Sequence, residues 1–301
     1  MDTSLIGLFC IVDDFCQVFL PHWKASLLEH QDKQRNKPSR MSTSEIMTLM
    51  IYFHQSHYRN FKHYYQREVQ GHLKKYFPKA VSYNRFVELM PTVLLPLCFF
   101  IAAQRKTPTG IYFVDSTVLR VCHHKRSHQN RVFKGLAKKC GSTMGWFYGF
   151  KLHLIVNDMG ELMAFKLSQA TTDDRVVLPE IAQGLTGKII GDKGYISQDL
   201  FNRLYEKGLQ LINKIRKNMK NRLMPIIDKI LLRKRGIIES VFDQLKNISQ
   251  IEHSRHRSVN NFMVNILAGL AAYCLQEKKP SLNIQRNLVS VATSVGILHI
   301  Q

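Results

Sequence analysis

Asp115 is the residue whose position in this sequence most favours chemistry, because its carboxylate interrupts an apolar run. Residues 111–121 (IYFVDSTVLRV) are rich in β-branched and aromatic side chains, which predicts a buried strand. An ionised carboxylate in such a strand costs several kcal/mol unless it is paired, hydrogen-bonded or bound to a metal. An isolated aspartate here is more often a turn cap, so Asp115 alone does not predict a site.

Asp192 repeats this situation at the end of a second apolar segment. It follows a short strand predicted at residues 188–190 and lies in the glycine turn GDKGY, residues 191–195. Ligand sites in α/β sheets lie beyond strand ends, where the chain changes direction. As a single observation, an aspartate at this place is more often a turn residue.

Glu239 is the third acidic candidate and belongs to a predicted helix. At roughly 100° per residue, Arg235, Glu239 and Lys246 fall within about 40° of one another. The simpler interpretation is a surface ion pair between Arg235 and Glu239, worth a few tenths of a kcal/mol. Beside them runs an apolar stripe that we expect to pack on the sheet, made of Ile238, Val241, Phe242, Leu245 and Ile248.

Together, these carboxylates are typical of a site for hard divalent cations. Asp115, Asp192 and Glu239 would come from a central strand, a second strand end and a late helix. Carboxylate oxygens suit Mg²⁺ or Mn²⁺. Two such ions about 3.5–4 Å apart can activate a nucleophile and stabilise a leaving oxygen in phosphodiester chemistry.

The charge of the chain indicates a polyanionic partner. The 301 residues include 43 Lys and Arg against 22 Asp and Glu, a net charge of +21, and the sequence pI is about 9.8. Nucleic acid fits better than a membrane, because no basic amphipathic anchor helix is evident. A soluble basic surface without such a partner explains a few units of charge better than 21.

Cationic segments also surround the acidic candidates. No acidic residue lies between Asp115 and Asp158, and Asp228 is the only acid from Lys214 to Arg235. The residues that we expect to contact DNA in and near these segments are Lys193, Arg131, Lys134, Lys138, Lys139, Arg216, Lys217, Arg255 and Arg257.

The first hundred residues show helical periodicity. Apolar residues recur at helical spacing over 4–20, and Ser42 with Glu45 forms a capping-box signature before another helix. Residues 58–65 interleave basic and aromatic side chains, which suits phosphate and base contacts but also an ordinary helix surface. We predict a helical DNA-binding domain over 1–105, with a linker near 105–110.

The spacing of apolar residues changes from helical to strand-like after residue 110. Strand-like segments follow at 111–121, 149–156 and 162–167, and a strand and helix alternation continues from about 175 to 215. This order predicts an α/β fold with a mixed sheet. The predicted catalytic domain covers 106–279, and the role of the tail at 280–301 is not predicted.

The remaining signals favour structural roles. Six scattered cysteines without a C-x-x-C motif predict reduced thiols. Their spacing with nearby histidines, as in Cys122-His123-His124, fits no standard zinc pattern. Asp173-Asp174 is expected to cap a helix. The start of the chain lacks a basic n-region, and the longest apolar runs are short for a bilayer, so we expect a cytoplasmic protein.

The motifs around the three acids resemble those of the DDE transposases of bacterial insertion sequences. The matching segments are YFVDST (112–117), GDKGY (191–195) and Arg235-x3-Glu239-x6-Lys246, the last part of a Y-x2-R-x3-E-x6-K signature. Leu232 occupies the tyrosine position of that signature, so a role for the tyrosine does not carry over. The resemblance covers about 111–276, including 144–153 and 253–258.

The resemblance implies an RNase H-like catalytic core, here preceded by the small all-helical domain. It implies that Asp115, Asp192 and Glu239 bind Mg²⁺ or Mn²⁺, as two ions, and that Arg235 and Lys246 contact DNA phosphates near the cut. The expected activity is binding of terminal inverted repeats, strand cleavage and strand transfer by at least a dimer. A non-catalytic DNA-binding regulator and a structure-specific endonuclease remain alternatives.

Overall fold

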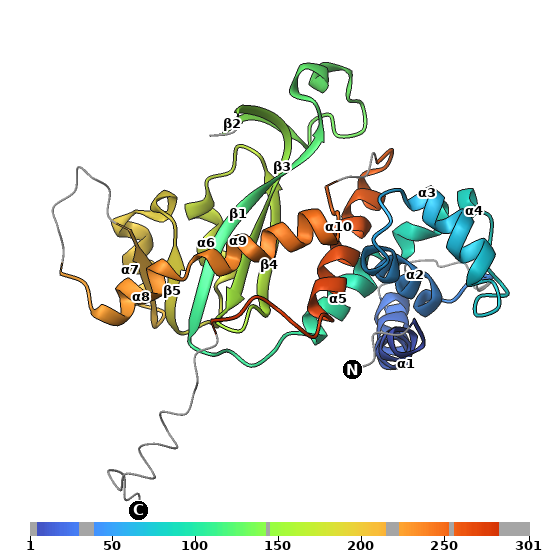
Figure 1. The fold of residues 1–301 in the computed structure, drawn as a ribbon, viewed down its shortest axis with the longest axis horizontal. Helices are drawn as coiled ribbons and strands as arrows, with labels where there is room; N and C mark the ends of the chain where they lie inside the picture. The colour runs from blue at the N-terminus through green and yellow to red at the C-terminus, as the bar shows by residue number, and fades with distance from the viewer. Residues whose placement is uncertain (1–4, 30–38, 143–144, 215–222, 253–255, 283–301) are drawn as a thin grey trace, which may run out of the picture.

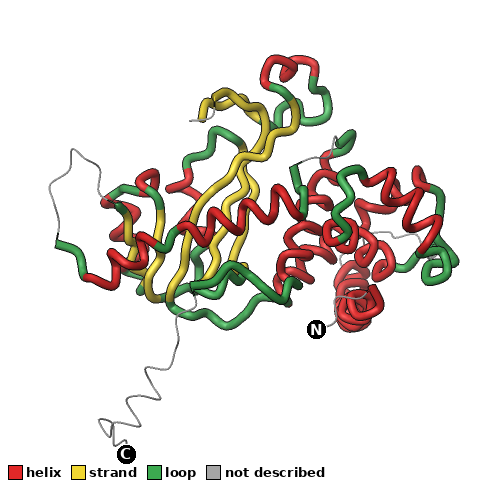
Figure 2. The backbone as a smooth tube through the Cα atoms, viewed as in Figure 1, coloured by secondary structure: helices red, strands yellow, loops and turns green. Residues whose placement is uncertain are grey.

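The computed structural model describes residues 5–29, 39–142, 145–214, 223–252 and 256–282. Three of the residues expected to contact DNA, Arg216, Lys217 and Arg255, lie outside the described residues, as does most of the tail at 280–301. Helices gather at one end of the molecule and the sheet forms the other (Figure 2).

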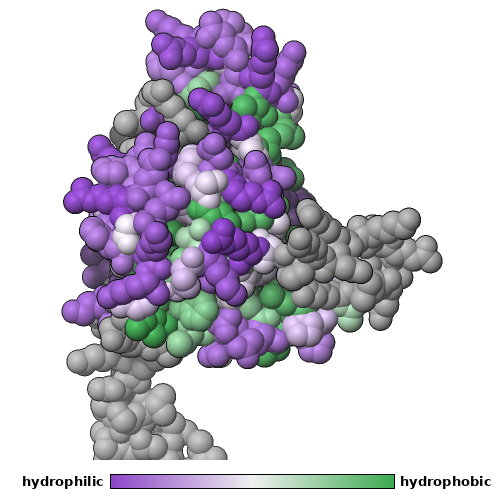
Figure 3. All heavy atoms as spheres, turned by 90° about the vertical axis from the view of Figure 1, so that its right-hand side faces the viewer, coloured by the Kyte–Doolittle hydropathy of each residue, from purple (hydrophilic) through white to green (hydrophobic). Residues whose placement is uncertain are grey.

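The N-terminal residues form the predicted helical body. Ser42 caps α2, its side chain accepting a hydrogen bond from the Glu45 N–H while the Glu45 carboxylate accepts from the Ser42 N–H, which confirms the capping box. On the side drawn in Figure 3, which looks onto this end, hydrophilic side chains surround smaller hydrophobic areas. The helices of this body are α1 (Leu5–Glu29), α2 (Thr43–Gln55), α3 (Phe61–Tyr64), a π-helical segment (Tyr65–His72), α4 (Tyr83–Leu89), a 3₁₀ turn (Met90–Val93) and α5 (Leu94–Ala103).

A mixed sheet follows, and its topology is RNase H-like. The central strand β1 pairs antiparallel with β3, β3 pairs antiparallel with β4, and β5 and β6 continue parallel on the other side of β1. The short β2 pairs with the first part of β3. The strands are β1 (Ile111–Cys122), β2 (Lys138–Ser142), β3 (Gly145–Asn157), β4 (Leu162–Gln169), β5 (Gly187–Gly191) and β6 (Leu209–Asn213). The mixed α/β sheet with flanking helices confirms the predicted fold class.

Helices cover both faces of this sheet, and the side chains of β1 alternate between them. Tyr112 and Val114 pack into a core with Leu178 and Leu200 of the helices on one face. Phe113 belongs to the larger core on the other face, where α9 crosses β1 (Figure 1). The helices of this part are α6 (Asp174–Ile181), α7 (Gln198–Tyr205), α8 (Ile226–Arg233), α9 (Gly236–Asp243) and α10 (Val259–Cys274).

The last helix, α10, joins the helical body rather than the sheet. It packs against α2 and α5, and the larger core runs without interruption from α1 to α10. The path of α8, α9 and α10 across the sheet toward this body is visible in Figure 1. The division into domains at residues 105 and 279 stays a prediction, with α10 as a physical link between the two parts.

One expectation about the late helix is wrong. Ile238, Val241, Phe242 and Leu245 of the predicted stripe are buried, but Ile248 is 39% exposed. The helix changes from α to π geometry over Gln244–Ile248. A π turn holds more residues than an α turn, so the α-helical spacing that predicted the stripe fails after Leu245.

Two helical stretches have the length and apolar composition of a membrane-spanning helix, Leu5–Trp23 and Tyr83–Ala103. The second contains the 3₁₀ turn at Met90–Val93 and packs into the helical body through α5. Core helices of globular proteins have the same composition, so this observation carries little weight. The expected absence of a membrane partner stays a prediction.

Gly149 is required by a close approach of β3 to β1. A Cβ added there would lie 2.0 Å from the carbonyl oxygen of Leu119, beside the register shift of β1 near Arg120. We expect Gly149→Ala to destabilise the fold by about 3 kcal/mol in urea unfolding. Gly141→Ala is the matched control, because no atom lies within 4 Å of its added Cβ. Equal unfolding midpoints for the two variants would contradict this packing.

Candidate active site

Asp115 lies on the face of β1 that α9 covers. Phe113, two residues earlier, is on the same face, because side chains alternate along a strand. Its side chain is 23% exposed. One carboxylate oxygen, Oδ1, accepts a hydrogen bond from the Ser116 backbone N–H at 2.8 Å, and the other, Oδ2, accepts from Arg235 at 2.9 Å. The carboxylate that the sequence placed inside an apolar strand is therefore paired and hydrogen-bonded.

Arg235 connects this strand to the late helix. Its guanidinium donates to Asp115 through one terminal nitrogen and to Glu239 through the other, the second contact being 2.5 Å. Arg235 lies just before α9, and Glu239 follows one turn later, exposed on the helix surface. The i, i+4 ion pair of Arg235 with Glu239, the simpler interpretation of the sequence, is present. Arg235 also contacts Asp115 on β1.

Asp192, the third predicted carboxylate, lies at the end of the strand next to β1. It follows β5, which pairs in parallel with β1, and it precedes a short 3₁₀ turn at Lys193–Tyr195. Its side chain is exposed. Asp192 lies close enough to Asp115 for its charge to act on that carboxyl.

The pKa of Asp115 reflects these neighbours. Burial raises the pKa of the Asp115 carboxyl above its ordinary value, and the negative charge of Asp192 raises it further. The hydrogen bond from Ser116 and the charge of Arg235 act in the opposite direction. The net rise means that burial outweighs the stabilising contacts of Ser116 and Arg235 with the ionised carboxylate.

The carboxylate oxygens of Asp115, Asp192 and Glu239 are of the type that a hard divalent cation binds, but the three side chains do not converge on one point. Among the residues that the structure describes, no three His, Cys, Asp or Glu side chains are placed so that they could hold a metal ion. The guanidinium of Arg235 lies between Asp115 and Glu239 and satisfies both. Two of the acids thus already share one cation, and the third, Asp192, adds negative charge beside them.

A second group of polar residues lies on the opposite face of the sheet, and the sequence reasoning missed its connection to the site. Ser116 donates its hydroxyl to Asp174 at 2.9 Å, and Lys151 donates to the same carboxylate at 3.0 Å. His153, whose pKa burial lowers to about 4, contacts Ser168 at 2.7 Å. Asp174 therefore contacts β1 on the face opposite Asp115, through Ser116, the residue that follows Asp115.

Asp174 and Asp173 make a matched pair for testing this role. Asp173 caps α6 as predicted, accepting from the Arg175 N–H. We expect Asp174→Ala to lower the rate of DNA strand cleavage about tenfold by loosening Ser116. We expect Asp173→Ala to cost about 1 kcal/mol of stability and to leave that rate unchanged. Cleavage rates and urea unfolding of both variants test this, and equal rates would contradict a positioning role for Asp174.

The predicted DNA contacts outside the Arg235 site are distributed over four places among the described residues. Lys193 is exposed beside Asp192. Lys246 is not free toward solvent, because it donates to the Val118 carbonyl oxygen at 2.6 Å and pairs with Glu252. Arg257 is exposed just before α10. The predicted contacts Arg131, Lys134, Lys138 and Lys139 are exposed on the segment between β1 and β3, which projects at the top of Figure 1.

A known protein family matches the chain in sequence. The family described as "Transposase DDE domain" matches residues 105–259, just over half of the chain. No curated protein sequence matches the chain. A piggyBac transposase synaptic complex with hairpin DNA is similar with a TM-score of 0.46 and 10% identity, over 99% of this chain and 77% of that one.

A second solved structure is more distant. The Mos1 strand transfer complex has a TM-score of 0.24 and 10% identity, over 86% of this chain and 84% of that one. Because both scores are below 0.5, the assignment rests on the sequence match and on the strand order.

The strand order of the sheet, with the half-buried Asp115 on its central strand, defines an RNase H-like fold. With the sequence match over 105–259, the chain belongs to the DDE transposases, enzymes that cleave and transfer DNA strands. The predicted family membership is thereby confirmed, whereas an origin in a bacterial insertion sequence stays a prediction.

Proposed function

We propose that this protein binds the terminal inverted repeats of its own element, cleaves a phosphodiester at each end, and joins the freed 3′-OH to target DNA. The observation that carries the proposal is the contact of Asp115, on the central strand, with Arg235, which also holds Glu239. Asp192, close enough for its charge to act on Asp115, supplies the third carboxylate.

In this proposal, Asp115, Asp192 and Glu239 would hold two Mg²⁺ or Mn²⁺ ions. Such ions would supply activation of the attacking oxygen and stabilisation of the leaving oxygen of the phosphodiester. The chain supplies the position of the three carboxylates and the charge of Arg235. Arg235 contacts a DNA phosphate after it leaves Asp115 and Glu239, because a guanidinium binds phosphate oxygens in the same forked geometry as carboxylates.

The proposed DNA partner agrees with the charge of the surface. The exposed cations Arg131, Lys134, Lys138 and Lys139 lie on the segment between β1 and β3, which follows directly from the strand of Asp115. Pairing two element ends requires at least two copies of the chain. We also propose a cytoplasmic location, with the protein nucleoid-associated when it is bound to DNA.

The experiment that tests the proposal uses duplexes made from the DNA flanking the gene, where short inverted repeats are expected. Purified protein with Mg²⁺ should nick these ends and join a pre-cleaved end to a supercoiled plasmid. A chelator should stop both reactions and leave DNA binding intact. Binding without nicking would favour the non-catalytic regulator, and nicking without joining would favour the structure-specific endonuclease.

A further inference from the structure

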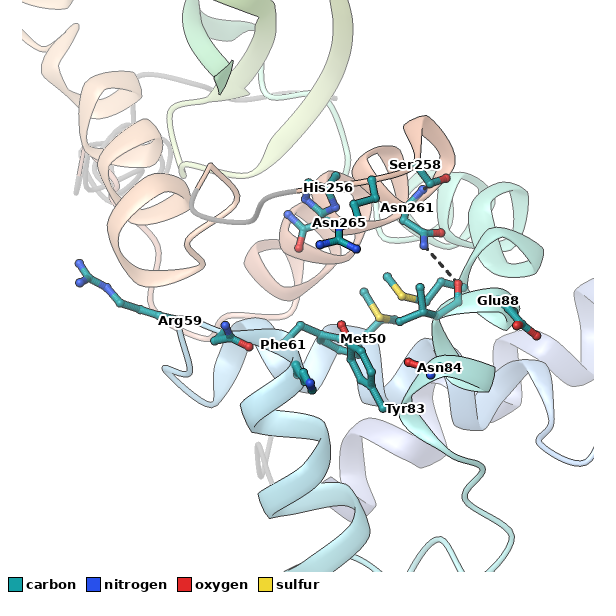
Figure 4. Close-up of a pocket in the computed structure, with 15 residues that line it drawn as sticks. Met50, Arg59, Phe61, Tyr83, Asn84, Glu88, His256, Ser258, Asn261 and Asn265 are labelled. Atoms are coloured by element: carbon teal, nitrogen blue, oxygen red, sulfur yellow. Dashed lines mark hydrogen bonds between the residues drawn. The ribbon is translucent and has the colours of Figure 1, made fainter. Parts of the chain in front are cut away.

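A cavity of about 940 Å³ lies in the helical body, away from the three acids. Its walls come from the segment at the start of α3, from α4 and from the N-terminal end of α10 (Figure 4). These elements are far apart in the sequence, and Asn261 ties two of them together by donating to the Val87 carbonyl oxygen at 3.1 Å. The proposed function assigns no role to this cavity.

The rim of the cavity is cationic. Arg59, Lys62 and Arg257 line it and are exposed. The one acidic residue in the described lining, Glu88, is paired with Arg85 at 2.7 Å. Because α10 begins at Val259, the partial positive charge of a 16-residue helix adds to this rim. The rim therefore favours an anionic group.

The floor of the cavity is apolar and aromatic. Met50 and Met90 are buried there, and Phe61 and Tyr83 are half-buried. The rings of Phe61 and Tyr83 lie 6.3 Å apart, and the Lys62 ammonium lies 5.9 Å from the centre of the Tyr83 ring. The two ring planes are tilted by 42°, so a planar heterocycle can stack on one ring and contact the edge of the other.

Two buried polar atoms in the lining residues are unsatisfied. The Oδ1 atom of Asn261, a residue that is 8% exposed, has no hydrogen-bond partner in the described part of the chain, and neither has Nε2 of His256. Burial lowers the pKa of His256 to about 4, so its ring is neutral at pH 7. A buried atom of this kind normally has a partner, which indicates a ligand with hydrogen-bonding groups.

We propose that this cavity binds one unpaired nucleotide of a DNA strand, with the phosphate at Arg59, Lys62 and Arg257 and the base on Phe61 and Tyr83. The unpaired state follows from the floor: a base inside a duplex is covered on both faces by its neighbours. The edge of the base then faces Asn261 and His256, whose side chains must turn toward the cavity to bond it because their orphaned atoms are buried here. The proposal rests on DNA being the partner of this protein, as argued above.

The test compares binding of two duplexes to the full chain in a chelator, which stops strand cleavage. One duplex is blunt and the other carries a single 2-aminopurine nucleotide as an overhang. We expect the overhang duplex to bind about tenfold more tightly, in the range that stacking of one base provides, with quenching of the 2-aminopurine fluorescence. A double variant, Arg59→Glu with Lys62→Glu, should reduce this ratio to about one.

The matched control is Lys74→Glu with Lys79→Glu, which changes the net charge equally at exposed positions outside the cavity. The control variant should bind both duplexes more weakly by the same factor, so that the ratio of their dissociation constants is unchanged. Equal binding of the two duplexes by the unaltered protein, or loss of the ratio in the control, would overturn the proposal. A third outcome would also overturn it: free deoxynucleoside monophosphate displaces the overhang duplex as effectively as a competing overhang strand does.

The outcome is separable from that of the proposed function. Mg²⁺-dependent cleavage without an overhang preference overturns the cavity assignment alone. An overhang preference in a protein that cleaves no DNA overturns the proposed chemistry alone.

Discussion

Asp115→Asn should abolish Mg²⁺-dependent nicking of element ends, with a fall in rate of at least about 10³-fold, while DNA binding is unchanged. Asparagine keeps the size of the side chain and one oxygen for the Ser116 N–H. It lacks the negative charge that a divalent cation requires. The loss is therefore one of chemistry rather than of folding or DNA affinity.

The matched control for this variant is Asp243→Asn, on the helix that carries Glu239. Asp243 is exposed and accepts a hydrogen bond from Asn247, one turn later. Single-turnover nicking rates and DNA dissociation constants of both variants should be measured together. An Asp115→Asn protein that nicks at the normal rate would show that the assignment is wrong.

Arg235→Ala should have opposite effects on metal affinity and on catalysis. Without the guanidinium between them, Asp115 and Glu239 are left unneutralised, so the DNA-free protein should bind Mn²⁺ several-fold more tightly. Cleavage should nevertheless fall about 10²-fold, since Arg235 no longer neutralises a phosphate near the cut. Calorimetric titration with Mn²⁺ and single-turnover cleavage measure the two effects separately.

Arg235→Lys separates charge from geometry in this position. Lysine restores the positive charge but not the fork that reaches Asp115 and Glu239 at once. We expect cleavage to recover only partly. Weaker Mn²⁺ binding by Arg235→Ala would contradict the view that Arg235 competes with the cation for these carboxylates.

The main elements were predictable from local patterns. β-branched and aromatic residues predicted β1, and the Ser42 and Glu45 pair predicted the start of α2. The short β2 was not predicted, because its sequence, KKCGS, has neither alternation nor β-branched residues. The π segment after Asp243 was not predicted either, since no residue type marks such a change of helical period.

The site was predictable in its residue types and less so in its contacts. An acid inside an apolar strand and an Arg–Glu pair on a late helix were evident, but their joining by Arg235 depends on how α9 crosses β1. The contact between Ser116 and Asp174 spans 58 residues. The alternation of β1 placed Ser116 on the face opposite Asp115, and this was the available signal for a partner there.

The direct test of the central claim is the position of Mn²⁺ in crystals of this protein bound to a cleaved element end. Anomalous scattering should place the metal on carboxylate oxygens of Asp115, Asp192 and Glu239, with Arg235 turned away toward a DNA phosphate. A metal bound elsewhere, with Arg235 still joining Asp115 to Glu239, would contradict the account.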